Sequence, residues 1–349
     1  MSPPLPRPYG LRPRVLGAAV LAALALAGCA PGAVEPEAPV RRPDPRPEVQ
    51  EGQPDQAQLR RARAERNRAA NAAAQSASLE SSPASRSQRD YYAAVEQRLL
   101  SQGRLRRDRV PQDAPIDAEM LTRNFLAIAL RDEYSQSADG LVAQDRSAPL
   151  RRWAQPVRMQ IEFGASTDTA ARPAWRSEVA DYAGQLSAAT GHPVSLTAQG
   201  GNFTILVLTE DERRAIGPRL QELVPGIPAR DRQILADLPP AITCSVFAYS
   251  QGGSSAYAHA VAVIRAELPR LLRSSCIHEE LAQGLGLAND SPGARPSLFN
   301  DDEEFALLTR HDELLLRILY DRRLSPGMTE AEAAPIVRQI ASELLGESA

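Results

Sequence analysis

The chain has 349 residues, 43% of them hydrophobic, which suits one large domain or two small ones and excludes wholesale disorder. The 40 basic residues (Lys+Arg) against 43 acidic ones give a formal net charge of −3. This near balance excludes a dedicated nucleic-acid binder, because such proteins carry a strong basic excess.

The N-terminus has the pattern of an exported lipoprotein. Arginines precede a short apolar run at residues 15–27, which is too short to cross a bilayer as a mature helix. The run ends in Leu26-Ala27-Gly28-Cys29, which resembles the lipobox of bacterial lipoproteins. The resemblance implies cleavage after residue 28 and acylation of Cys29, for example with palmitate. The alternative is an ordinary signal peptide with a chance cysteine.

An acylated Cys29 implies a membrane partner and a place in the bacterial cell envelope, facing the periplasm. Ala30 replaces the aspartate that retains enterobacterial lipoproteins in the inner membrane, so the outer membrane is favoured. The following Pro-, Ala- and Arg-rich segment cannot bury a core. We therefore divide the chain into a signal peptide (1–28), a disordered tether (29–88) and a single globular domain (89–346).

Mixed strands and helices are expected first in the domain, followed by helices alone. Hydrophobic periodicity predicts helices from about 89, at 118–132, 173–189 and 209–223, and strands at 157–163, 194–197, 203–208, 242–249 and 257–265. The last two strands are expected to pair antiparallel across Gly252-Gly253. From Leu268 onward the pattern is helical. This order predicts an α+β fold with a small mixed sheet and a helical C-terminal half.

Two cysteines, Cys244 and Cys276, remain if Cys29 is acylated. An even number in an oxidising compartment predicts a disulfide between them, which would contribute about 3–4 kcal/mol. The alternative is a pair of buried free thiols. Neither cysteine belongs to a CxxC pattern of metal or redox sites.

The densest polar constellation is Cys276-Ile277-His278-Glu279-Glu280-Leu281-Ala282-Gln283, which continues to Asn289-Asp290. With Phe299-Asn300-Asp301-Asp302 and Tyr320 downstream, and Asn124-Phe125 and Arg152-Trp153 upstream, it resembles proteobacterial lipoproteins called domain-of-unknown-function family 2927. The likeness spans roughly residues 89–346. It implies no activity, because none is assigned to that family.

The same stretch also resembles a degraded zincin helix, in which H-E-x-x-H binds zinc through two histidines and the glutamate activates water. A frame that starts at His278 puts Ala282, which cannot bind a metal, at the second ligand position. A frame that starts at Glu279 keeps Glu280 as the base but replaces the second histidine with Gln283. The strand expected just before this helix also fits the zincin arrangement.

The frame that starts at Glu279 retains Gly286 and ends at Asn289, where a metzincin has its third ligand. The candidate catalytic residue is Glu280, and the candidate metal ligands are Glu279, Gln283 and His278. Oxygen and amide groups suit harder divalent cations better than zinc. The structural alternative is that these residues stabilise a helix start and satisfy buried backbone groups.

A zinc site could form in spite of the missing histidines only if folding brought His278 and His311 together with a carboxylate such as that of Asp301 or Asp302. His311 and Asp312 are adjacent and could orient one another as imidazole and carboxylate. The alternatives are helix capping and pairing on the helix surface. Other enzyme motifs, including G-x-S-x-G, the P-loop and the dinucleotide fingerprint, do not occur in the sequence.

The sequence favours an envelope lipoprotein whose zincin-like domain binds a peptide or an envelope protein without cleaving it. The first alternative is a metal-dependent peptidase with atypical ligands for a divalent metal. The second is a purely structural lipoprotein. No nucleic-acid partner and no organic cofactor are expected.

Overall fold

The structure is a computed structural model that describes residues 60–61, 63–66, 68, 82–137, 140–300 and 302–346. The expected signal peptide, Cys29 and nearly all of the expected tether lie outside these residues. The described residues form helices and a mostly parallel sheet, which confirms the predicted α+β class.

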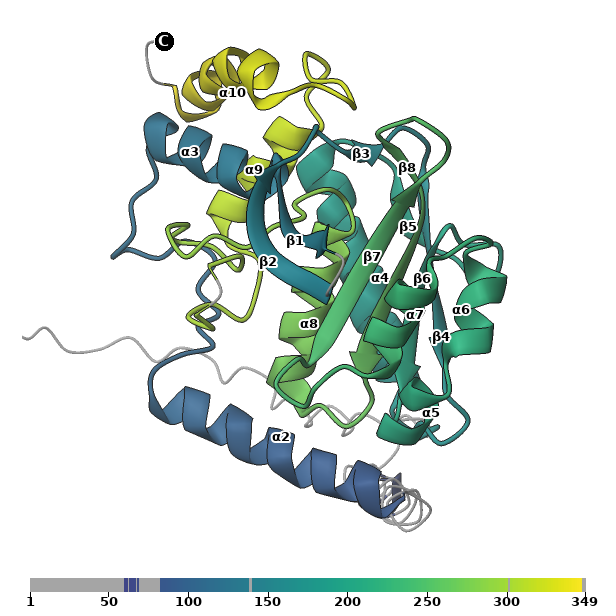
Figure 1. The fold of residues 1–349 in the computed structure, drawn as a ribbon. Helices are drawn as coiled ribbons and strands as arrows, with labels where there is room; N and C mark the ends of the chain where they lie inside the picture. Colours follow the sequence, from purple (N-terminus) through teal and green to yellow (C-terminus); the bar gives the residue numbers. More distant parts are fainter. Residues whose placement is uncertain are drawn as a thin grey trace, which may run out of the picture. The chain divides into compact units, whose positions relative to one another are not determined.

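A six-stranded sheet lies at the centre of the domain (Figure 1). The strands are β3 (Arg152–Trp153), β4 (Val157–Phe163), β5 (Val194–Leu196), β6 (Phe203–Leu208), β7 (Cys244–Ser250) and β8 (Ala256–Arg265). Neighbours in the order β3-β8-β6-β4-β5 pair in parallel, and β7 pairs antiparallel with β8. The β7–β8 pairing confirms the hairpin predicted across Gly252-Gly253.

Both faces of the sheet are buried, and the side chains of its central strands alternate between two cores. Ile205 and Val207 of β6 face the main core, whereas Leu206 and Leu208 face a smaller second core. Helices α4 and α8 pack in the main core, and the short helices α6 and α7 pack in the second; α5, which joins β6 to α6, contributes no residue to it. Their bounds are α4 (Arg172–Thr190), α5 (Glu210–Arg214), α6 (Gly217–Leu223), α7 (Ala229–Ala236) and α8 (Arg270–Gln283).

The helices outside the sheet layers are α2 (Pro83–Ser101), α3 (Ala118–Ala129), α9 (Arg310–Leu319) and α10 (Glu330–Leu345). Figure 1 shows α3, α9 and α10 gathered at one end of the domain. A capping box at Thr309 and Asp312 begins α9, and one at Thr329 and Glu332 begins α10. After Leu268 the named elements are helices α8, α9 and α10, as the sequence predicts, but the described residues between Gln283 and Arg310 form a long irregular segment that the prediction did not include.

Two sequence expectations near helix ends were wrong. The helix expected at 118–132 ends at Ala129, and a two-stranded hairpin follows, formed by β1 (Arg131–Ser137) and β2 (Gly140–Ser147). The helix expected at 209–223 divides into α5 and α6 because Pro218, in the first turn of α6, has no N–H for a continuous helix.

Helix α2 begins at Pro83 rather than near Arg89, and Ser82 caps it by accepting a hydrogen bond from the Ser85 N–H. Its buried face docks on the domain. The Ser85 hydroxyl donates to the Glu267 carboxylate at 2.6 Å, and the Tyr92 hydroxyl donates to the Pro240 carbonyl at 3.0 Å. The segment that leaves the expected tether is therefore packed into the fold.

Candidate functional site

The two glutamates of the polar constellation lie on α8, which follows β8 after a short turn. The residue before α8, Pro269, offers no side-chain cap. Glu96 of α2 supplies one: its carboxylate accepts hydrogen bonds from the N–H groups of Leu271 at 2.9 Å and Leu272 at 3.0 Å. Helix α2 therefore fixes the start of the helix that carries the candidate residues.

The end of α8 is fixed by a close backbone approach. Gly286 has a φ of +127°, and a Cβ at this position would lie 2.3 Å from the Arg151 carbonyl oxygen. Only glycine fits such a contact. The Tyr320 hydroxyl donates to the Leu285 carbonyl at 2.9 Å. The glycine of the zincin-like frame thus has a packing role at the helix end.

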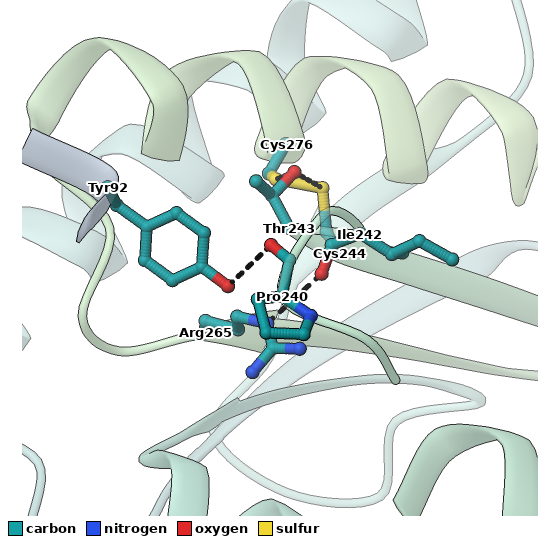
Figure 2. The surroundings of a disulfide bond; sticks show 7 residues. All are labelled: Tyr92, Pro240, Ile242, Thr243, Cys244, Arg265 and Cys276. Atoms are coloured by element: carbon teal, nitrogen blue, oxygen red, sulfur yellow. Dashed lines mark hydrogen bonds between the residues drawn. A yellow bond between two sulfur atoms is a disulfide. The ribbon is translucent and has the colours of Figure 1, made fainter. Parts of the chain in front are cut away.

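A disulfide joins Cys244, the first residue of β7, to Cys276 of α8, which confirms the predicted pairing. The two Cα atoms lie 5.9 Å apart, and the exposed fractions are 6% for Cys244 and 1% for Cys276. The Thr243 hydroxyl lies 3.4 Å from Cys244 Sγ and 3.2 Å from Cys276 Sγ, and Tyr92 of α2 lies nearby (Figure 2). The edge strand is therefore covalently attached to the helix of the candidate site.

Glu279 and Glu280 come together beside this disulfide. One carboxylate oxygen of each and Cys244 Sγ all lie within 4.8 Å of one another. Glu280 is buried and Glu279 is half-buried. Both candidate residues thus point toward one place between α8 and β7.

The two amides of the zincin-like frame have other partners. Gln283 donates from Nε2 to the Asp290 carboxylate at 3.2 Å. Asn289 donates from Nδ2 to the Ala127 carbonyl at 2.8 Å, and its N–H donates to the Ile128 carbonyl at 3.0 Å. Asp301 lies outside the described residues. Asn289 therefore attaches the loop after α8 to α3.

His278 is held in a tight aromatic contact. Its Nδ1 accepts a hydrogen bond from the Leu308 N–H at 3.1 Å, and its ring stacks on Tyr182 with 4.0 Å between ring centroids. Burial lowers the pKa of His278 to about 4, against a smaller raising effect of the Asp312 charge. At neutral pH the imidazole is therefore uncharged and serves as an acceptor for the backbone.

We expect this histidine to make the domain less stable in mild acid. Its pKa is about 4 when folded and about 6.5 when unfolded, so the unfolded chain binds the proton more tightly. The free energy of unfolding should be highest above pH 6.5 and should fall by about 3 kcal/mol as the pH drops toward 4. Urea unfolding of the wild-type chain between pH 4.5 and 7.5 measures this loss.

The matched variant for this measurement is His278→Asn, whose side-chain oxygen keeps an acceptor for the Leu308 N–H but does not titrate. The difference in unfolding free energy between wild type and variant should shrink as the pH falls, because carboxylate titrations are common to both chains. Parallel pH profiles of the two proteins would show that His278 does not carry the effect.

His311 and Asp312 are both fully buried and serve the start of α9. The Asp312 carboxylate accepts hydrogen bonds from the Thr309 N–H and hydroxyl, both at 2.9 Å. Asn124 Nδ2 lies 3.0 Å from His311 Nε2, which therefore acts as the acceptor, and His311 Nδ1 faces Asp312 Oδ1 at 3.3 Å. Asp312 therefore caps α9, as one alternative predicted, and its carboxylate also faces the His311 ring. The expected surface pairing was wrong, because both side chains are fully buried.

A buried ionic cluster, which the sequence patterns described above do not predict, lies where β6 and β8 end. Glu210, the first residue of α5, contacts the guanidinium groups of Arg213 and Arg265, and Arg265 ends β8. The exposed fractions are 3% for Glu210 and 1% for each arginine. The sequence does hold a signal for this cluster: two apolar strands are each followed or ended by a charged residue, Glu210 in TILVLTE and Arg265 in AVAVIR.

A pocket of about 320 Å³ lies at the opposite, amino-terminal ends of β3 and β5. Arg152 donates from Nη1 to the Leu319 carbonyl at 2.5 Å and from Nη2 to the Leu324 carbonyl at 2.7 Å. Its charge therefore compensates carbonyls at the end of α9. Arg152, Trp153 and Tyr320, which carry part of the family resemblance, are among the lining residues.

Residues 118–339 match the family described as "Protein of unknown function (DUF2927)". The chain belongs to this family. No curated protein and no solved structure matches the chain. The family match begins at the first residue of α3 and includes α8, the disulfide and the pocket.

Proposed function

We infer that this member of the family is a lipid-anchored protein of the cell envelope whose domain binds a peptide or an envelope protein without cleaving it. The noncatalytic part of this proposal depends on one observation: side chains at candidate ligand positions are already hydrogen-bonded to other groups of the protein. His278 accepts from the Leu308 N–H, Gln283 donates to Asp290, and Asn289 donates to a backbone carbonyl. These contacts favour a structural use of positions that bind zinc in a zincin.

Two features support a zincin-like ancestry for the domain. A buried strand, β8, leads directly into α8, and α8 carries Glu279 and Glu280 in the spacing of the zincin frame. Gly286 occupies the glycine position of that frame. A domain that keeps this scaffold and lacks the histidines is suited to bind a chain that it does not hydrolyse.

The anchoring part of the proposal is supported by the lipobox-like Leu26-Ala27-Gly28-Cys29 and by the Cys244–Cys276 disulfide. Disulfides persist in oxidising compartments such as the bacterial periplasm. Among the described residues, none of the helices combines the length and apolar character of a membrane span. The attachment that we propose is through acyl chains on Cys29, because this residue ends the lipobox-like sequence.

The first test measures zinc in the full-length oxidised chain purified without chelator. We expect less than stoichiometric zinc and no peptide hydrolysis, because the frame with intact spacing has no histidine at a ligand position. Stoichiometric zinc that is lost together with hydrolysis in His278→Ala would overturn the noncatalytic proposal and favour the metal-dependent peptidase.

The second arm tests the anchor by metabolic labelling of cells with palmitate. The wild-type chain should incorporate the label and fractionate with membranes, and Cys29→Ser should lose the label. Cys276→Ser is the matched control, since it removes a cysteine that is not in the lipobox. Equal labelling of wild type and Cys29→Ser would rule out acylation at this residue.

A further inference from the structure

Four potential metal ligands gather where β7 meets α8. Cys276, Glu279 and Glu280 are spaced i, i+3 and i+4 on α8, so their side chains leave the same face of the helix. Cys244 approaches this face from β7, bonded to Cys276. Cys244 Sγ and one carboxylate oxygen of each glutamate lie within 4.8 Å of one another. Cys276 Sγ lies outside this group of three but next to it, because it is bonded to Cys244 Sγ.

The disulfide prevents this group from acting as a metal site in the oxidised chain. The thiolate is the form of cysteine that binds metals, and the sulfurs of a disulfide carry no such charge. Only the carboxylates of Glu279 and Glu280 remain as anionic ligands in this state. The oxidised protein therefore lacks half of the ligands that the arrangement offers.

We propose that reduction of the Cys244–Cys276 disulfide opens a metal site for a divalent cation of the zinc class, held by Cys244, Cys276, Glu279 and Glu280. The reductant is a dithiol, which becomes a disulfide as it delivers two electrons and two protons to the two sulfurs. The cation then displaces both thiol protons to solvent and binds the two thiolates. In the reverse step the two sulfurs return two electrons to a disulfide, which takes up two protons and becomes a dithiol, and the re-formed Cys244–Cys276 bond releases the cation.

The ligand set selects the class of metal. Two thiolates and two carboxylates suit a four-coordinate cation such as Zn²⁺, Co²⁺ or Cd²⁺, whereas Mg²⁺ and Ca²⁺ require oxygen ligands throughout. The site is enclosed, since Cys244, Cys276 and Glu280 have exposed fractions of 6%, 1% and 4%.

A second group is placed to support the thiolates. The Thr243 hydroxyl lies 3.4 Å from Cys244 Sγ and 3.2 Å from Cys276 Sγ, within reach of both sulfurs (Figure 2). A hydroxyl that donates to a metal-bound thiolate orients the ligand and stabilises its charge. Thr243 would thus be a positioning residue of the reduced site.

This inference goes beyond the proposed function and does not depend on it. The zincin-like frame uses Gln283 and Asn289, whereas the site proposed here uses the two cysteines in their place. Zinc content of the oxidised chain tests the proposed function. Metal binding by the reduced chain tests the present inference, so the two fail separately.

The experiment titrates Co²⁺ into the full-length chain, before and after reduction with a phosphine that adds no competing thiol. The reduced wild-type chain should bind one Co²⁺ and show the near-ultraviolet charge-transfer band of thiolate-bound cobalt. The oxidised chain should show no such band. The Cys244→Ser/Cys276→Ser double variant, which retains Cys29, subtracts any contribution of that residue.

Carboxylate variants decide whether the folded site, rather than any pair of thiols, binds the ion. Glu279→Gln and Glu280→Gln should each weaken Co²⁺ binding at least about tenfold, since loss even of an outer partner has this effect. Glu222→Gln is the matched control, on the exposed surface of α6. A reduced wild-type chain without a band above the double variant would overturn the proposal. So would equal affinities in all three glutamine variants.

A thermal measurement covers the case in which the reduced chain is partly unfolded. Co²⁺ should raise the midpoint of unfolding of the reduced wild-type chain, because a ligand of the folded state stabilises it by mass action. The oxidised chain and the double variant should show no rise. An unchanged midpoint for the reduced wild-type chain would contradict a preformed site.

Discussion

Replacing Glu210 with glutamine should lower the free energy of unfolding by about 3–5 kcal/mol, the range expected when one partner of a buried ion pair is removed. The Glu210 carboxylate accepts hydrogen bonds from Arg213 Nη2 at 3.0 and 2.9 Å, and its second oxygen contacts Arg265 Nη1. Both guanidinium groups are almost fully buried. Without the carboxylate, two buried cations would face each other's charge.

The remaining partners of the cluster do not replace the lost charge. Arg213 also donates to the Leu235 carbonyl at 3.0 Å, and Arg265 donates to the Leu238 and Pro239 carbonyls at 2.8 and 3.0 Å. Carbonyl dipoles solvate a guanidinium but do not neutralise it. Because these carbonyls belong to α7 and to the segment before β7, we expect this region to loosen first in the variant.

Urea unfolding at neutral pH measures the effect of Glu210→Gln. Glu222→Gln provides the matched control, because its ion pair with Arg219 is exposed and should contribute less than about 1 kcal/mol. A Glu210→Gln chain within 1 kcal/mol of wild type would mean that water or a rearrangement compensates the two arginines.

Loss of the disulfide should have an effect of similar size. The bond closes a loop with a sequence separation of 32 residues, and the chain-entropy relation assigns about 3.5–4 kcal/mol to a loop of this length. Reduction of the wild-type chain, or the Cys244→Ser/Cys276→Ser double variant, should therefore lower the free energy of unfolding by this amount. Urea unfolding with and without reductant measures it.

The double variant also supplies the control, since reductant should not change its stability. A reductant effect of equal size in both chains would show that the loss does not come from this bond. If wild type and double variant unfold at the same urea concentration, the prediction is wrong. Residual contacts between β7, β8 and α8 in the unfolded chain would then restrict it as much as the bond does.

The strands of the sheet were predictable because burial leaves a pattern in the sequence. A strand with one buried face alternates between apolar and polar residues, and a strand buried on both faces is a continuous apolar run. Phe203–Leu208 is apolar at nearly every position and is buried on both faces. The end of α3 was not predictable from periodicity, because residues 118–132 keep helical spacing through the helix end. The hairpin that follows has an Asp139-Gly140 signal, which that pattern concealed.

The candidate site was predictable in part. Helix spacing put Glu279 and Gln283 on one face with Glu280 on its flank, and the even number of remaining cysteines predicted the disulfide. Spacing does not fix rotamers, however, and Gln283 turns to Asp290 instead of joining the glutamates. That Cys244 completes a cluster with Glu279 and Glu280 depends on a contact between β7 and α8, which the sequence pattern does not encode.

Because α2 caps α8, the unit that folds is longer than the segment that matches the family. The family match begins at residue 118, whereas Glu96 and Tyr92 make their contacts from outside it. A chain that began at Ala118 would leave the N-terminus of α8 uncapped and would expose the core beneath Tyr92. The smallest unit that folds on its own therefore begins no later than Ser82. Because α2 joins the expected tether to the domain and caps α8, release of α2 would disturb the helix that carries Glu279 and Glu280.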